Sequence, residues 1–293
     1  MPIETVAIMA PGDMGHSVGA VLKAKGLRVV TCLAGRSERT RALAAQAGID
    51  DLGDDAALVA TADVLLSIVV PAQADALAQR SADALRAESR DLLYADCNAI
   101  APETARRIGA LIEAAGAPFV DAGIIGPPPR PAATSTRFYA SGAAAPEFAA
   151  LRDYGLDVRI VSERAGDASA LKMCYAALTK GTTAIMTELK IAAARLGVTE
   201  ALDAELALSQ AAMLERMRRS VPAMAPKAHR WVGEMEEIAK TFADASLTPS
   251  IFEGAAALYA SVAATPLGQI SPEEWASEQR LLDQVISALA SRS

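Results

Sequence analysis

A long stretch without proline, residues 166–197, constrains the fold of this chain more than any other part. It reads GDASALKMCYAALTKGTTAIMTELKIAAARLG and has one interior glycine, Gly181. Gly166 and Asp167 can cap its start, and Gly197 stands where a left-handed C-terminal residue is expected. At about 1.5 Å per residue it would form a helix of roughly 45 Å, longer than one small domain needs. The stretch therefore predicts a long helix between two domains.

Two stripes of side chains run along this predicted helix. The apolar stripe, which we expect to form one continuous packing seam, consists of Leu171, Tyr175, Leu178, Thr182, Ile185, Leu189, Ala192 and Leu196. Lys172 lies on the second stripe, among the small and hydroxyl side chains of Ser169, Ala176, Thr179 and Thr183. On the helix alone a solvated lysine is the simpler interpretation, so the role of Lys172 depends on what precedes it. Lys180, about 80° further round an ideal helix, is interpreted as structural.

Composition narrows the class of protein. With 293 residues and 52% hydrophobic content, the chain can bury a large core, and we expect two domains. Its net charge of -7 argues against nucleic acid or an anionic membrane as a partner. No apolar run approaches about 18 residues, so we expect neither a membrane span nor a signal peptide. Three scattered cysteines and two histidines predict no metal site and a reduced, cytoplasmic protein.

The N-terminus carries the first ligand motif. Residues 5–10 read as a buried strand, the turn APGDMG follows, and a helix runs to about Lys25. This order matches the dinucleotide fingerprint, in which a glycine turn brings the pyrophosphate to a helix N-terminus. The predicted cofactor contacts in the turn are Ala10, Gly12, Asp13, Met14 and Gly15.

The second strand, residues 28–33, bears on the choice of cofactor. An NAD site favours a carboxylate near its end, where Leu33 and Ala34 stand. Arg36, Ser37 and Arg39 could instead hold a 2′-phosphate through charge-assisted hydrogen bonds. These residues could also be an ordinary basic helix start, and Glu38 lies among them. We favour NADP, with NAD as the alternative.

Alternating strands and helices continue along the first half. Strands are expected at residues 64–70, 92–95, 119–121, 137–142 and 158–161, with helices at 71–84 and 102–115. The pattern predicts a doubly wound parallel sheet, in which ligands bind at the carboxyl ends of strands. Val70, Pro71 and Asn98 fall at such ends, as does the run from Gly123 to Gly126. Asn98 is either a loop cap or a contact for substrate or nicotinamide.

The second half reads as helices only. They are expected at residues 199–219, ended by Pro222, and at 226–245, 249–263 and 271–290. We place the domains at residues 1–165 and 166–293. His229, Trp231, Glu234 and Glu237 cluster on one predicted helix. Glu234 and Glu237 share a face and could pair with Lys172 or substrate, or form a solvated or intersubunit face.

Over residues 5–195 the chain resembles the β-hydroxyacid dehydrogenases. Four motifs in order carry this resemblance: the glycine turn, DCNAIAPET, DAGIIGPPP and GDASALKMCYAALTKG. That family includes 3-hydroxyisobutyrate and 6-phosphogluconate dehydrogenases, and the segment PKAHRWVGEMEEIAKTF resembles a little-characterised domain allied to the C-terminal domain of the latter. The resemblance implies a Rossmann-type N-terminal domain followed by an all-α domain, an α/β fold overall. It also implies a homodimer with interlocked helical domains.

The resemblance assigns roles to individual residues. It makes Lys172 the catalytic acid/base, and Asn98 replaces the serine of a strand-end segment that meets substrate and nicotinamide. It makes Gly123, Ile125 and Gly126 part of a substrate segment, with Ile125 in place of serine. The asparagine four residues after the lysine becomes Ala176, with Tyr175 beside it.

We therefore expect an NADP-dependent β-hydroxyacid dehydrogenase or reductase that acts on a small hydroxy or keto acid. Lysine can remove or donate the hydroxyl proton as hydride moves, provided that its surroundings adjust its pKa. Ile125, Tyr175, Ala176 and Trp231 would make the pocket apolar, which suggests an aryl- or alkyl-bearing 3-hydroxy acid. The alternatives are an imine reductase of the same architecture and a non-catalytic NADP-binding dimer.

Overall fold

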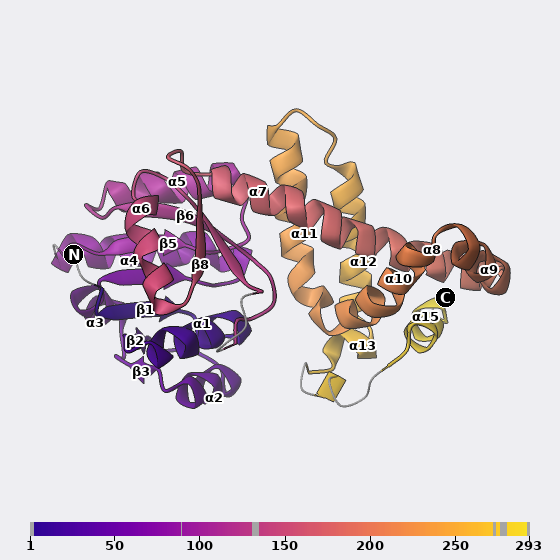
Figure 1. Cartoon of the computed structure of the whole chain (residues 1–293), viewed down its shortest axis with the longest axis horizontal. Coiled ribbons are helices and arrows are strands. Elements are labelled where there is room, and N and C mark those ends of the chain that lie inside the picture. The colour runs from indigo at the N-terminus through magenta and orange to yellow at the C-terminus, as the bar shows by residue number, and fades with distance from the viewer. Residues whose placement is uncertain (1–2, 89, 131–134, 272–273, 276–279, 292–293) are drawn as a thin grey trace. The chain divides into compact units, whose positions relative to one another are not determined.

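The chain divides into two compact units, residues 1–173 and 174–293 (Figure 1). The computed structural model describes residues 3–88, 90–130, 135–271, 274–275 and 280–291. The first unit is α/β and the second is helical, which is the fold class expected from the sequence. The division lies within the long helix rather than at residues 165/166, because the start of that helix packs on the sheet.

The described residues of the first unit form one sheet in the order β3-β2-β1-β4-β5-β6-β7-β8. Its strands are β1 (Thr5–Met9), β2 (Arg28–Thr31), β3 (Asp50–Asp51), β4 (Val64–Ser67), β5 (Leu93–Asp96), β6 (Phe119–Ile125), β7 (Arg137–Ser141) and β8 (Asp157–Ser162). Neighbouring strands are parallel except for the antiparallel pair β6 and β7. Since the chain winds outward in both directions from β1, the switch point of a doubly wound sheet lies at β1 and β4.

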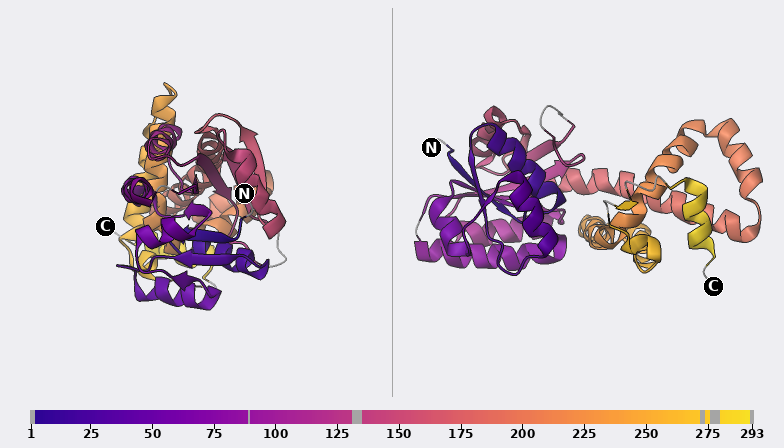
Figure 2. Two further views of the ribbon diagram at one scale, coloured as in Figure 1. Left: turned by 90° about the vertical axis from the view of Figure 1, so that its left-hand side faces the viewer. Right: turned by 90° about the horizontal axis from the view of Figure 1, so that it is seen from below.

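Helices cover both faces of this sheet (Figures 1 and 2). One face packs on α1 (Asp13–Ala24), α2 (Glu38–Ala47) and α6 (Ala145–Phe148), and the other on α3 (Asp55–Thr61), α4 (Pro71–Glu88) and α5 (Pro102–Glu113). Alternate residues of one strand enter opposite cores: Val6 and Ile8 face the first, and Ala7 and Met9 the second. Strands buried on both faces explain the continuous apolar runs of the sequence.

Most predicted elements of this unit are confirmed. The polar region between residues 38 and 61 also contains α2, β3 and α3, which the apolar pattern does not reveal. Strand β4 ends at Ser67, earlier than predicted, and β6 continues to Ile125. The antiparallel direction of β7 is a departure from the predicted parallel sheet.

The long helix is continuous in sequence but changes its winding. It comprises α7 (Asp167–Ala176), a π-helical turn (Ala177–Gly181) and α8 (Thr182–Leu196). Gly197 ends it in the left-handed conformation, with φ of 73°, as the sequence predicts. Because a π-turn holds more residues than an α-turn, the 80° offset of Lys180, which assumes an ideal helix, does not apply.

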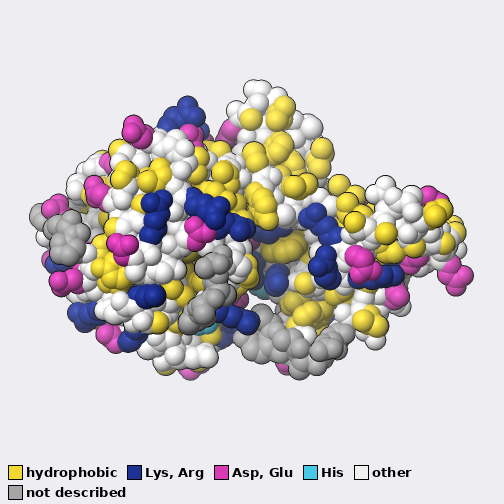
Figure 3. Space-filling model, in the orientation of Figure 1, with side chains coloured by type: hydrophobic (Ala, Val, Ile, Leu, Met, Phe, Trp, Pro, Cys, Tyr) yellow, Lys and Arg dark blue, Asp and Glu magenta, His cyan; other side chains and the backbone are white. Residues whose placement is uncertain are grey.

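The predicted packing seam is wrong for the isolated chain. Leu178, Ile185 and Leu196 are 62%, 59% and 75% exposed. Apart from Met186, the buried face of α8 carries smaller or polar side chains, among them Ala184, Thr187 and Lys190. Lys190 is fully buried and forms an ion pair of 2.5 Å with Asp203. On the face drawn in Figure 3, hydrophobic side chains are exposed over much of the helical unit.

The described part of the helical unit continues with α9 (Thr199–Ser209), α10 (Ala211–Met224), α11 (Ala228–Asp244), α12 (Ser250–Ala263), α13 (Pro266–Gln269) and α15 (Leu282–Ala290). The single helix expected at 199–219 is divided at Gln210, whose φ of -137° is not helical. Pro222 does not end it: α10 runs on to Met224, since a proline in the last turn removes only one hydrogen bond. Of the helix expected at 271–290, residues 272–273 and 276–279 lie outside the described residues.

Candidate functional site

The glycine turn after β1 has the geometry of an anion site. A Cβ on Gly15 would lie 3.1 Å from the side chain of Ile8 and would also meet the backbone of Ala10, so only glycine lets α1 pack on β1. A Cβ on Gly12 would meet no atom within 4 Å, which leaves open space before the first turn of α1. The N–H groups of that turn and the helix dipole favour a phosphate there. The turn therefore fits the pyrophosphate of a dinucleotide.

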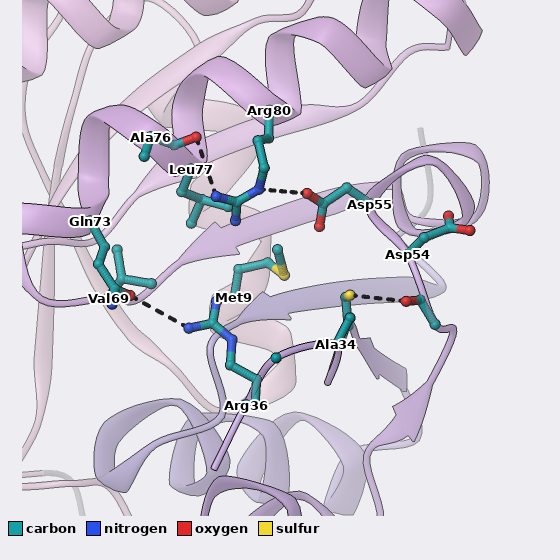
Figure 4. A pocket seen from close by; sticks show the side chains of 13 residues that line it. Met9, Ala34, Arg36, Asp54, Asp55, Val69, Gln73, Ala76, Leu77 and Arg80 are labelled. Atoms are coloured by element: carbon teal, nitrogen blue, oxygen red, sulfur yellow. Dashed lines mark hydrogen bonds and ion pairs between the residues drawn. The ribbon is translucent and has the colours of Figure 1, made fainter.

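A cavity of about 460 Å³ opens beside this turn, between the loops that follow β2 and β4 (Figure 4). Arg36 reaches into it and donates to Gln73 Oε1 at 3.5 Å. Arg80 lies on the same face of α4 as Gln73 and is paired with Asp55 at 2.9 Å. The cavity thus combines apolar walls with two guanidinium groups, a combination suited to an adenosine that carries a phosphate.

The other two residues predicted for the 2′-phosphate have structural partners. Ser37 caps α2 and accepts a hydrogen bond from Thr40 N at 3.2 Å. Arg39 forms an ion pair with Asp13 at 2.5 Å, so its guanidinium is turned toward the glycine turn. Of the predicted basic group, Arg36 is the residue that lines the cavity.

Asn98 joins two strand ends rather than pointing into open space. Its side chain is 2% exposed; its amide nitrogen donates to Ser67 Oγ at 2.8 Å and to Asp96 Oδ2 at 3.0 Å. Its carbonyl accepts from Val69 N at 2.7 Å and so fixes the loop that leads to Val70 and Pro71. This geometry favours the loop-cap interpretation, with the exposed Val70 held at the rim.

Two buried carboxyl groups lie side by side below these loops. Asp96 and Asp121 are paired in register across β5 and β6, and each is 1% exposed. Asp121 accepts four hydrogen bonds, from Ser141 Oγ, Gly166 N, Ser169 N and Ser169 Oγ, at 2.6–3.0 Å. Two of the donors are backbone N–H groups at the start of α7. Asp121 therefore ties the first turn of α7 to the sheet.

Burial dominates the titration of both carboxyls. It raises the pKa of Asp96 to about 7, and the neighbouring carboxyl of Asp121 adds to that rise, while hydrogen bonds from Asn98 and the charge of Lys172 oppose it. Burial also raises the pKa of Asp121, although its hydrogen bonds from Ser169, Ser141 and Gly166 oppose the change. Asp96 has fewer hydrogen-bond donors than Asp121 to oppose this effect of burial.

Lys172 lies over this pair. A Cβ on Gly123 would lie 3.1 Å from Cβ of Lys172 and 3.0 Å from the carbonyl oxygen of Ala168, so α7 crosses β6 in contact with its backbone. The lysine is partly buried, and its charge acts on Asp96 and Cys97. Ile125 is buried beyond Gly123, and Gly126 is required by its φ of 130°. The first unit thus brings together Lys172, Gly123 and the loop of Asn98.

The remaining predicted residues belong to the helical unit. Tyr175 is 47% exposed and Ala176 is buried. Trp231 packs edge-on against Tyr259, and Lys180 Nζ lies 5.3 Å from the Trp231 ring. Glu234, for which a pairing with Lys172 or substrate was considered, forms an ion pair with Lys180. Within its own unit, Trp231 is therefore part of a packed cation–aromatic cluster.

Several residues of the site were not predicted from the sequence. Asp96 and Asp121 stand in quoted motifs, and a carboxylate that ends an apolar strand is itself a signal of a buried charge. Gln73 and Arg80 are seven residues apart on one helix face, a spacing that could have revealed them. Ser67, Ser141 and Ser169 offered no signal, because a single serine at a strand end or helix start is common.

Among the described residues, no group of histidine, cysteine or carboxylate side chains could hold a metal ion. None of the helices described is both long and apolar enough to cross a membrane.

Comparison with known proteins agrees with this geometry. Residues 5–153 match the model of the NAD binding domain of 6-phosphogluconate dehydrogenase, and residues 193–262 match a domain of unknown function, DUF1932. An uncharacterised 28.5 kDa protein of Methanothermus fervidus is 29% identical over 191 residues, which cover 65% of this chain and 71% of that protein.

Solved structures extend the similarity over both units. The conserved protein MTH1747, of unknown function and described as structurally similar to 3-hydroxyacid dehydrogenases, is 30% identical with a TM-score of 0.66; the match covers 88% of this chain and 96% of that one. Mycobacterium tuberculosis 3-hydroxyisobutyrate dehydrogenase shares the fold at 19% identity, with a TM-score of 0.71 and coverage of 99% and 100%.

The buried carboxyl of Asp96 gives a pH-dependent stability. Because its pKa rises from 3.8 to about 7 on folding, the folded chain holds the proton more tightly. This contribution to stability is full below pH about 4 and is lost as the pH rises to about 7, by at most about 1.4 kcal/mol per pH unit. Asp96→Asn should flatten this slope in urea unfolding at several pH values, and Asp91→Asn, at an exposed position, should not. An unchanged slope in Asp96→Asn would contradict the assignment.

Proposed function

The chain belongs to the β-hydroxyacid dehydrogenase family of NAD(P)-dependent oxidoreductases, and we propose that it transfers hydride between NADP and the carbinol carbon of a small 3-hydroxy acid. The observation that supports this proposal is the position of Lys172. The amine-bearing helix is tied by Asp121 to the carboxyl edge of the sheet, beside Gly123 and the Asn98 loop. This is the edge at which doubly wound sheets bind their ligands.

Different residues of the chain have different roles in the proposed reaction. Lys172 is the general acid/base: its amine takes the hydroxyl proton during oxidation, and its ammonium returns it to the carbonyl oxygen during reduction. Gly123 lacks a side chain, so α7 and its lysine approach the strand closely. The Asn98 hydrogen bonds fix the loops around the reacting atoms, and the glycine turn holds the pyrophosphate.

The choice of NADP rests on Arg36. It lines the cavity with Arg80, and guanidinium groups bind phosphate through short, charge-assisted hydrogen bonds. The carboxylate of Asp55, which could otherwise repel a phosphate, is already paired with Arg80. For the substrate, Ile125 supports an apolar side chain, because it is buried where the family has serine. We therefore favour an alkyl- or aryl-bearing 3-hydroxy acid; the contacts expected from Tyr175, Ala176 and Trp231 stay predictions.

We also propose a homodimer in which a second copy covers the exposed apolar stripe of the long helix, from the π-helical turn along α8. Leu178, Ile185 and Leu196 lie on that stripe, and large side chains so exposed are unusual on a monomer unless they mark an interface. The three cysteines are free thiols, which agrees with the cytoplasm as the proposed compartment.

Replacement of the catalytic amine tests the proposed reaction. Lys172→Ala should lower turnover of the best hydroxy acid by about 10²-fold or more and leave NADP affinity within a few-fold, because the amine moves a proton and does not hold the cofactor. Lys25→Ala, at an exposed lysine, is the control. Nicotinamide absorbance should be followed with hydroxy acids, keto acids and cyclic imines. Turnover of imines alone would favour an imine reductase, and cofactor binding without any turnover a non-catalytic module.

A pair of arginine variants tests the cofactor. Arg36→Ala should weaken NADP far more than NAD, by about tenfold or more, since it removes a charged hydrogen bond to the 2′-phosphate. Arg39→Ala is the matched control: its guanidinium is held by Asp13, and its loss should affect both cofactors alike. Fluorescence titration of the reduced cofactors measures both. Equal losses of NADP and NAD in Arg36→Ala would reject the phosphate role.

A further inference from the structure

Two acidic side chains meet under the helix that carries Lys172. The strand pairing places Ser67, Asp96 and Asp121 in one row across β4, β5 and β6. Asp121 and Gly123 lie on the same face of β6, since their positions differ by two. Asp121 contacts the first turn of α7, and Gly123 contacts the next turn at Lys172. The carboxyls of Asp96 and Asp121 thus face the segment of α7 that bears the lysine.

The carboxyl groups of Asp121 and Asp96 accept different numbers of hydrogen bonds. Asp121 accepts four hydrogen bonds, three at Oδ2 and one at Oδ1. Asp96 accepts two, both from Asn98, and neither donor carries a charge. A fully buried carboxylate with two neutral donors and a second carboxylate beside it is costly unless a cation compensates it. Lys172 is a cation whose charge acts on Asp96.

The other titratable groups around Lys172 do not cancel this arrangement. Cys97, next to Asp96 at the end of β5, also feels the charge of the lysine, and burial raises the pKa of its thiol, so that it stays neutral. On α7 itself, Asp167 is paired with Arg164 and accepts from Ser162. Asp121 lies one strand further on, and its hydrogen bonds oppose the rise in pKa that burial causes. Among the residues that the structure describes, the sheet therefore presents two acidic groups to the lysine, and no second cation.

We propose that Asp96 is a positioning residue which, together with Asp121, holds Lys172 as an ammonium ion. An opposite charge nearby favours the charged form of an amine. The protein is thereby set up to donate a proton near neutral pH. On the proposed function, from which this consequence follows, reduction proceeds at neutral pH, whereas oxidation needs alkaline conditions that remove the proton from Lys172.

The experiment measures the amine itself in the free protein. Trace amounts of an acylating reagent label Lys172 at a series of pH values, and mass spectrometry of the peptide gives the pH of half-maximal reactivity, with the exposed Lys25 as internal reference. Asp96→Asn should lower that pH by about one unit, and Asp121→Asn should shift it in the same direction. Ser67→Ala removes a different hydrogen bond of Asn98 and no charge, so it should leave the value unchanged.

The outcomes separate the charge effect from the chemistry. Folded Asp96→Asn and Asp121→Asn proteins whose Lys172 reacts as in the parent would overturn the inference, whatever the enzyme turns over. If Ser67→Ala shifted the labelling midpoint of Lys172 as much as Asp96→Asn does, the inference would also be overturned. The order of the loop, and not the charge of Asp96, would then be the cause. The expected shift in a chain that turns over no hydroxy acid, keto acid or imine would support the charge role and reject the proposed function. In an active enzyme, the alkaline limb of the reduction pH profile should move with the labelling midpoint.

Discussion

The site depends on the buried carboxylate of Asp121. It accepts both the backbone N–H of Ser169 and its hydroxyl, and so it fastens the start of α7 to the middle of β6. Burying that charge is compensated by four hydrogen bonds and by the positive end of the helix. Because α7 is fixed at this point, Lys172 lies one turn further on, directly against Gly123. One interaction between strand and helix therefore decides where the amine is presented.

Two neighbouring regions at the carboxyl edge of the sheet attract ligands of opposite charge. At β1 the glycine turn and the N-terminus of α1 attract an anion, and Arg36 and Arg80 extend that character into the adjoining cavity. At β5 and β6 the paired carboxyls attract a cation, which the chain supplies as Lys172. A dinucleotide with its phosphates at the first region and its reacting ring toward the second would meet a matching charge at each end.

The sequence predicted the order of helices and strands better than it predicted which residues each of them contacts. Apolar runs and turn glycines reveal β1, β4, β5 and the ends of the long helix, since each depends on local pattern alone. Helix α2 and strand β3 were not predicted from the sequence, because they are polar and short. The predicted seam of α8 faced outward, because periodicity shows that a helix has an apolar face but not which molecule covers it. The partners of Glu234, Asn98 and Asp121 arise from long-range pairing, which sequence spacing does not encode.

The central claim is that Lys172 stands at the nicotinamide end of the cofactor site. The most direct measurement is the rate at which an amine reagent acylates Lys172 in the free protein and in the protein saturated with NADP, with Lys25 as reference. The account predicts that NADP slows the reaction of Lys172 several-fold and leaves Lys25 unaffected. Equal rates for Lys172 with and without bound NADP would place the amine away from the cofactor and contradict the account.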